Sequence, residues 1–85
     1  MTNIKALSDL NEGQKAIVTE LETHNDIRRR LQDMGVIEGT SIECINKSPL
    51  GDPAAFLIRG AVIALRKEDS KTIKVKYQIE ERGLA

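Results

Sequence analysis

The stretch that decides the fold of this chain reads Asp26-Ile27-Arg28-Arg29-Arg30-Leu31-Gln32-Asp33-Met34-Gly35-Val36-Ile37-Glu38-Gly39-Thr40. Ile27, Leu31 and Met34 recur at spacings of four and seven, so they share one face of a short amphipathic helix. Gly35 is expected to end this helix in the left-handed conformation, and Gly39 marks a turn before the next strand. The stretch therefore predicts a short helix, pressed onto the core through Ile27, Leu31 and Met34, between two strands.

Working outward from the helix, five short segments are predicted to be strands, at 14–21, 40–46, 55–58, 61–65 and 72–79. The last shows the clearest period of two. The first carries apolar residues on both faces, which we attribute to an element covering its outer side. Leu7 and Leu10 are expected to dock on the core from a turn over 6–13, and Arg59-Gly60 suits a tight hairpin. The pattern favours a mainly β fold, a small closed or nearly closed barrel, over a split α+β sheet.

The length and charge of the chain exclude several classes of protein. Its 85 residues suffice for one domain, predicted over 1–85 with a core at about 4–79 and a tail at 80–85. Thirteen basic and thirteen acidic residues give no net charge, which argues against a nucleic-acid module and a polybasic membrane anchor. Neither a membrane span nor a signal peptide is apparent, and Cys44 is the single cysteine. A cytoplasmic protein without direct membrane insertion is expected.

The chain resembles the FeoA family of small cytoplasmic ferrous iron transport proteins. The resemblance rests on an arginine-led helix followed by two glycines over 29–40, and on shorter matches in order along the chain, at Leu7-Ser8-Asp9-Leu10 with Gly13, at 49–53, at 61–66 and at 73–75. It implies a five-stranded SH3-like barrel with a short helix inserted after the first strand. The same module occurs at the C-terminus of metalloregulators of the diphtheria toxin repressor type.

The resemblance also implies a function. FeoA-like proteins are non-enzymatic accessory proteins of ferrous iron uptake, which dock on or regulate the FeoB membrane GTPase-permease. The alternative is a stand-alone metalloregulatory SH3-like module with transition-metal binding. No cofactor is expected, and no nucleic-acid partner. Weak homo-oligomerisation through sheet edges stays open.

Three residues are candidates for contact with a protein partner. Arg28 is the arginine of the helix left over if Asp26 pairs with Arg30 and Arg29 with Asp33, although an exposed charge is often no more than a solvated surface. Leu50 is the apolar residue of a loop stiffened by two prolines, and it either contacts a partner or folds back onto its own barrel. Phe56 follows the same loop.

The sequence shows neither a complete set of metal ligands nor a pair of catalytic residues. Glu22, His24 and Asp26 alternate along one segment and carry the oxygen and nitrogen ligands that ferrous iron accepts, yet nothing completes a ligand set. We therefore expect a solvated strand end there and no metal site. Cys44 has no histidine or second cysteine near it in sequence and is expected to be a buried apolar residue. No nucleophile and base are paired, so we expect no catalytic residues.

Overall fold

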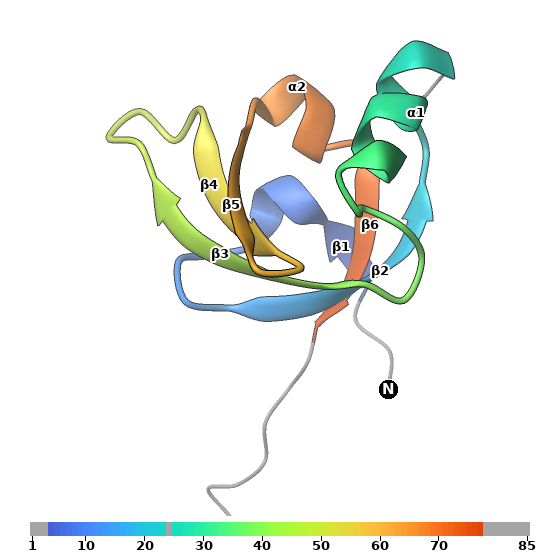
Figure 1. Ribbon diagram of the computed structural model, residues 1–85. Coiled ribbons are helices and arrows are strands. Elements are labelled where there is room, and N and C mark those ends of the chain that lie inside the picture. The colour runs from blue at the N-terminus through green and yellow to red at the C-terminus, as the bar shows by residue number, and fades with distance from the viewer. Residues whose placement is uncertain (1–3, 24, 78–85) are drawn as a thin grey trace, which may run out of the picture.

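The computed structural model describes residues 4–23 and 25–77. In this part of the chain six strands and three short helices form, and the strands make one antiparallel sheet in the order β1-β6-β2-β3-β4-β5 (Figure 1). Along the sequence the elements are β1 (Ile4–Ala6), the 3₁₀ helix η1 (Leu7–Asp9), β2 (Lys15–Leu21), α1 (Asn25–Asp33), β3 (Ser41–Lys47), β4 (Ala54–Ile58), β5 (Ala61–Leu65), α2 (Lys67–Ser70) and β6 (Ile73–Tyr77). The mainly β fold is confirmed.

The described residues hold one strand more than the five expected from the sequence. The extra strand is β1, which pairs Ile4 with Lys76 and Ala6 with Lys74 of β6. Three residues are too few to show a period of two, so the pattern could not reveal it. In consequence α1 follows the second strand of the chain and not the first. The predicted docking turn contains η1, and both Leu7 and Leu10 are buried as expected.

Two register shifts bend the sheet into a barrel. One lies in β2 between Val18 and Glu20, and the other in β3 between Cys44 and Asn46. An extra residue in one strand of a pair kinks the strand and strengthens its twist. The sheet curls until α2, which follows β5, contacts η1, which follows β1 (Figure 1). The two edge strands therefore end near each other at the same side of the molecule.

The register shift in β2 also explains why apolar residues appear on both faces of this strand in the sequence, a pattern that we attributed to a covering element. Ala16, Val18 and Leu21 are all buried, although the spacing from Val18 to Leu21 breaks the alternation of an ideal strand. The bulge absorbs the additional residue, so all three side chains reach the same interior. Leu21 therefore lies inside the barrel because of the bulge, and the expectation that an element covers it from outside is wrong.

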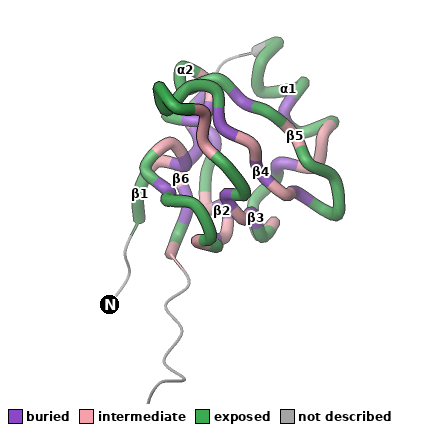
Figure 2. The backbone as a smooth tube through the Cα atoms, turned by 90° about the vertical axis from the view of Figure 1, so that its left-hand side faces the viewer, coloured by how far each residue is buried: buried purple, intermediate pink, exposed green. Residues whose placement is uncertain are grey.

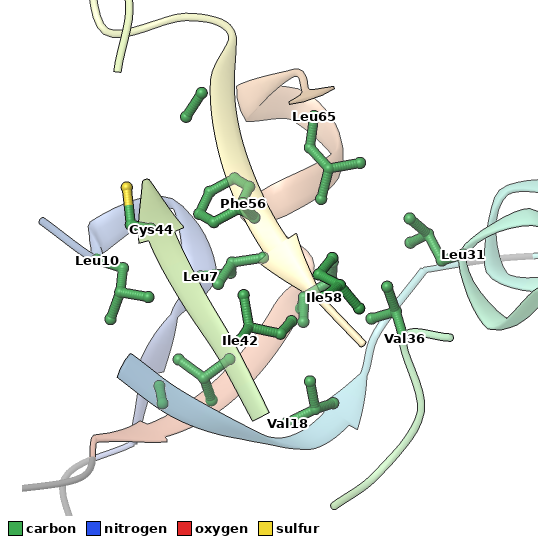
Figure 3. Close-up of a cluster of buried hydrophobic side chains, with 14 of the residues drawn as sticks. Leu7, Leu10, Val18, Leu31, Val36, Ile42, Cys44, Phe56, Ile58 and Leu65 are labelled. Carbon is green, nitrogen blue, oxygen red and sulfur yellow. The ribbon is translucent and has the colours of Figure 1, made fainter. Parts of the chain in front are cut away.

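The core is one cluster of apolar side chains inside the barrel; Figure 2 shows where the buried residues lie along the backbone, and Figure 3 shows their side chains. Each of β3, β4 and β6 buries alternate residues, as the pleat of a strand requires. Phe56 of β4 is the largest fully buried side chain. The other fully buried large side chains come from η1 and its flank, from four strands and from the turn after α1, namely Leu7, Leu10, Val18, Val36, Ile42, Cys44, Ile58, Ile73 and Val75.

Helix α1 ends in the way that its glycine predicts. Gly35 has φ +101°, and its N–H donates to the carbonyl of Gln32 at 3.0 Å. The N–H of Val36 donates to the carbonyl of Leu31 at 2.9 Å, and both of these residues are buried. This pair of bonds, with an apolar contact between the residues that close it, is the Schellman motif. The motif turns the chain back so that Leu31 and Val36 enter the core together.

The apolar face of α1 is only partly used by the core. Leu31 is 2% exposed and Met34 packs against the buried cluster, as expected. Ile27, however, is 39% exposed, so its predicted burial is wrong. It lies slightly more than two turns before Gly35, where the helix ends. This end of α1 stands away from the barrel.

Gly35→Ala is expected to lower the free energy of unfolding for two reasons, the backbone strain of its positive φ and a clash with Arg59. A Cβ at Gly35 would lie 2.6 Å from Cδ of Arg59, which is closer than real contacts allow. An L-residue in the left-handed region costs roughly 1–2 kcal/mol, and displacement of the Arg59 side chain adds to this. Urea unfolding followed by circular dichroism gives the free energy of unfolding of each variant.

Gly13→Ala is the matched control, because Gly13 has φ +88° and a Cβ added to it would meet no atom within 4 Å. It measures the strain without the clash. In an Arg59→Ala background the loss at Gly35 is expected to fall to that of the control. Equal losses for the two glycines in the native background would show that the contact with Arg59 carries no energy.

Candidate partner-binding surfaces

The loop between β3 and β4 holds Leu50 out in solvent on a hydrogen-bonded turn. The N–H of Gly51 donates to the carbonyl of Ser48 at 2.7 Å, and the N–H of Ser48 donates to the carbonyl of Pro53 at 3.2 Å. Leu50, between these bonds, is 93% exposed. The alternative in which Leu50 folds back onto its own barrel is therefore wrong. An apolar side chain on a constrained turn loses little conformational freedom on binding, which suits it to contact with a partner.

A side-chain bond fastens the base of the same loop to α2. Oδ1 of Asp52 accepts a hydrogen bond from the N–H of Lys67 at 2.9 Å. Lys67 is the first residue of α2, where free N–H groups favour a carboxylate. The loop is thus held at both of its ends and across to a second element. These hydrogen bonds fix the position in which Leu50, at the tip of the loop, is exposed.

Phe56, the second candidate near this loop, lies in the core. Its side chain has no exposed surface and sits among Leu7, Cys44 and Ile58 (Figure 3). In a strand with one buried face the register fixes which residues point inward, and Phe56 shares the inward face of β4 with Ala54 and Ile58. A direct contact of Phe56 with a partner is therefore excluded, and that candidate is corrected.

The arginines of α1 are exposed, and the pairings expected for them do not form. Arg28, Arg29 and Arg30 are all exposed. In the part of the chain that the structure describes, the one ion pair joins Lys74 to Glu22 at 3.9 Å. Each solvated pair within a helix is worth only tenths of a kcal/mol, too little to fix long side chains. Arg28 stays available to a partner, but it is not distinguished from its neighbours by the lack of a pair.

Of the three weak metal candidates, the structure describes Glu22 and Asp26. Glu22 pairs with Lys74, Asp26 is exposed at the start of α1, and His24 lies outside the described residues. Within 4–23 and 25–77 no three side chains of the metal-binding types form a cluster. Cys44 is fully buried, and burial raises the pKa of its thiol, with the Coulombic effect of Lys47 opposing. A neutral buried thiol behaves as a small apolar group.

Two features of the surface escaped the sequence patterns. Arg59 has φ +50° in the two-residue turn between β4 and β5, a conformation that glycine or asparagine adopts more readily. The second feature is a hollow of about 470 Å³ between α1 and the end of β5. For the first feature, the Arg59-Gly60 pair predicts the turn but not the position of the Arg59 side chain. The hollow depends on how far α1 stands from the barrel, which spacing along the sequence does not fix.

Comparison with known proteins identifies the family. The FeoA domain family model matches residues 5–77. The chain belongs to the FeoA family. The Fe(2+) transport protein A/Fe(2+) transporter FeoB fusion protein of Porphyromonas gingivalis is 33% identical to it over 70 residues, which cover 82% of this chain and 8% of the fusion protein. The putative Fe(2+) transport protein A of Campylobacter jejuni is 30% identical over 69 residues, which cover 81% of this chain and 93% of that protein.

Solved FeoA structures share the fold. The FeoA-like protein of Clostridium acetobutylicum superposes with a TM-score of 0.85 at 34% identity, over 96% of this chain and 95% of that one. FeoA of Stenotrophomonas maltophilia, an SH3 domain protein in complex with zinc, gives 0.71 at 29% identity over 88% of both chains. The expected SH3-like barrel is thereby confirmed.

A metal-dependent regulator has the same fold. A manganese-dependent transcriptional repressor gives a TM-score of 0.81 at 13% identity, over 92% of this chain and 44% of the repressor. At this identity the likeness concerns the fold alone, so it leaves open which function of the FeoA fold this chain performs. In the described part of the chain, no helix combines the length and the apolar character needed to cross a bilayer.

Phe56→Ala is expected to lower the free energy of unfolding by about 3–5 kcal/mol, because it leaves a cavity at the centre of the barrel. The measurement is chemical denaturation at equilibrium. Leu57→Ala is the matched control, since Leu57 is half-buried on the opposite face of β4 and its removal leaves no internal cavity. A loss at Phe56 no larger than that at Leu57 would contradict its central place in the core.

Proposed function

We propose that this protein is a non-enzymatic accessory factor of ferrous iron uptake that works at the cytoplasmic side of a FeoB-type GTPase-permease. The observation that carries the proposal is the fusion protein of Porphyromonas gingivalis, in which Fe(2+) transport protein A and the FeoB transporter are one chain. A covalent link raises the effective concentration of one part near the other, which is useful where the two parts act together.

The Leu50 loop is the first surface we assign to this contact. A side chain that is 93% exposed on a turn closed by backbone hydrogen bonds offers apolar area with little entropy to lose. Apolar anchors of this kind at the centre of an interface account for much of the affinity of protein complexes. Arg28 on α1 is the second element, a flexible charge suited to an acidic rim on the permease, where it would act mainly on the rate of association.

The proposal assigns no chemistry to the protein itself. The lone thiol is buried with a raised pKa, and no three His, Cys, Asp or Glu side chains form a cluster within the described residues. An activated nucleophile needs a partner within hydrogen-bonding reach, and Cys44 has no such group beside it. We therefore expect that the purified protein does not hydrolyse GTP and that its effect on transport requires the permease.

Leu50→Ser is expected to weaken binding to the detergent-solubilised permease by about 5- to 30-fold, as for the loss of one apolar anchor. Biolayer interferometry with the permease immobilised gives the dissociation constant. Arg28→Glu is expected to slow association, and more strongly at low ionic strength than at high, because the charge acts through the long-range field.

Ile37→Ser is the matched control, because Ile37 is an exposed isoleucine in the turn before β3 whereas Leu50 follows the other end of that strand. It is expected to bind like the native protein. Native-like binding by Leu50→Ser and Arg28→Glu together would remove both surfaces from the proposal. No association of the native protein with the permease in native membranes would overturn the function itself.

A second candidate function is a stand-alone metalloregulatory module, and the zinc complex of the Stenotrophomonas maltophilia relative favours it. Its ligands would come from the segment that contains Glu22, His24 and Asp26. The exposed ion pair between Glu22 and Lys74 does not prevent this, because such pairs are weak. The cysteine is unsuitable, since a metal would have to displace its proton inside the barrel.

Titration with Zn²⁺ and Fe²⁺, followed by NMR of the backbone amides, separates the two functions. The accessory-factor proposal predicts no saturable shift of residues 20–26 at equimolar metal. Saturable shifts there that disappear in a Glu22→Gln/Asp26→Asn variant would support the metalloregulatory module instead. Lys74→Met is the control, because it releases Glu22 from its ion pair without removing a ligand.

A further inference from the structure

The edge of the sheet at β5 has no partner in the described part of the chain. The strand order ends at β5, which pairs with β4 alone. Because Ile58 and Ala61 close a two-residue turn, the backbone groups of alternate residues from Ala61 onward bond to β4. Those of Val62 and Ala64 point the other way, and neither residue bonds to the backbone of any other described element.

This edge lacks the features by which proteins protect free strands. Natural edges are usually short, or carry a charged residue, a proline or a bulge. At the opposite end of the sheet, β1 is three residues long and includes Lys5. By contrast β5 reads Ala-Val-Ile-Ala-Leu, and Val62 is 64% exposed. An apolar edge of this length is a ready template for another extended chain.

Helix α1 forms a wall beside this edge. The hollow of about 470 Å³ is lined by residues of α1 and its end, of β5 and of the segment that follows, namely Ile27, Arg30, Leu31, Met34, Ala64, Leu65, Arg66, Glu68 and Asp69. Successive strand residues point to opposite faces, so a hollow that contacts both Ala64 and Leu65 meets the strand at its edge.

The walls of the hollow specify what fits. Ile27, left 39% exposed, and the half-buried Met34 give α1 an apolar side there. Arg30 and Arg66 are both exposed, and neither lies within ion-pair distance of a described carboxylate, including those of Glu68 and Asp69 in the same hollow. A segment that adds to β5 would thus meet an apolar wall and two guanidinium groups that are not held in ion pairs, with the carboxylates of Glu68 and Asp69 on the α2 side of the hollow.

We propose that the groove between β5 and α1 binds an extended peptide segment as an additional strand on β5, a segment with an apolar side chain and, two residues away, an aspartate or glutamate. Residues two apart on a strand share a face, so the apolar side chain reaches Ile27 and Met34 while the carboxylate reaches Arg30 and Arg66. Backbone bonds to Val62 and Ala64 supply affinity, and the two side chains supply specificity.

The charges of the groove argue against a second copy of this chain as the occupant. Antiparallel pairing of two β5 strands about their centre would place Val62 opposite Ala64 of the other copy. That strand contains no carboxylate, so the added strand itself would offer none to Arg30 and Arg66. The inference does not depend on which protein supplies the segment, and it holds or fails separately from docking on the permease.

Selection from a phage-displayed library of random peptides of about twelve residues tests the proposal, since this length spans a strand with flanks. Enrichment of an apolar residue followed at the second position by an acidic one is expected. Fluorescence anisotropy then gives the dissociation constant of the enriched peptide in labelled form. Methylation of its alternate amide nitrogens is expected to weaken binding at least about tenfold in the set that faces β5, because strand addition requires those donors.

Variants of the protein test the same contact from the other side. Val62→Pro removes an N–H that points away from β4, and is expected to weaken binding about tenfold or more, whereas Val62→Thr, which keeps the N–H, is expected to stay within about twofold. Arg30→Ala is expected to weaken the acidic peptide but not its glutamine analogue. Because the N-methylated peptides are tested on the native chain, misfolding of a variant does not remove the test.

Three results would overturn the inference. The first is no enriched peptide. The second is equal binding of peptides methylated on either set of amides, since this would show that strand addition is not the mode of binding. The third is a dimer of the native protein that Val62→Pro dissociates and Val62→Thr does not, since this would assign the edge to a second copy.

Discussion

Leu31 and Val36 meet across the turn at Gly35, and this contact fixes where α1 stands relative to the barrel. Gly35 allows the chain to reverse, the two hydrogen bonds of the turn satisfy the last carbonyls of the helix, and the two side chains close the core beside Ile58 (Figure 3). Leu31 and Met34 near this end of the helix pack on the core, whereas Ile27 in its first turn is 39% exposed. The wall of the β5 groove is a direct result of that one-sided attachment.

Arg59 contacts the same end of α1. Its side chain lies against Gly35, and its backbone adopts a left-handed conformation that costs a non-glycine residue free energy. The contact gives a reason why the turn between β4 and β5 tolerates that cost, since the arginine stem covers the exposed side of the helix end. Helix, turn and edge strand thus form one assembly at one end of β5, whereas the Leu50 loop belongs to the other end of β4.

The sequence predicted the elements of the barrel where local patterns determine them. Period-two alternation located β6, and the spacing of Leu31 and Met34 with Gly35 located the end of α1, because these signals depend on residues adjacent in the chain. It did not reveal β1, which is too short to show a period, or the bulge that brings Leu21 inside. Among candidate site residues, the burial of Phe56 was decided by which face of β4 points inward. This depends on pairing with distant strands.

The functional assignment depends on surfaces and not on the fold, since FeoA proteins and a metal-dependent repressor share the barrel. One hydrogen bond connects the Leu50 loop to the β5 groove. Oδ1 of Asp52 holds the Leu50 loop to the first residue of α2, and the next two residues of α2 line the β5 groove. A ligand that binds at the Leu50 loop or at the β5 groove and shifts α2 would therefore change the binding free energy at the other of these two surfaces. By thermodynamic reciprocity the effect is equal in both directions, so two partners of this small domain would sense one another without touching.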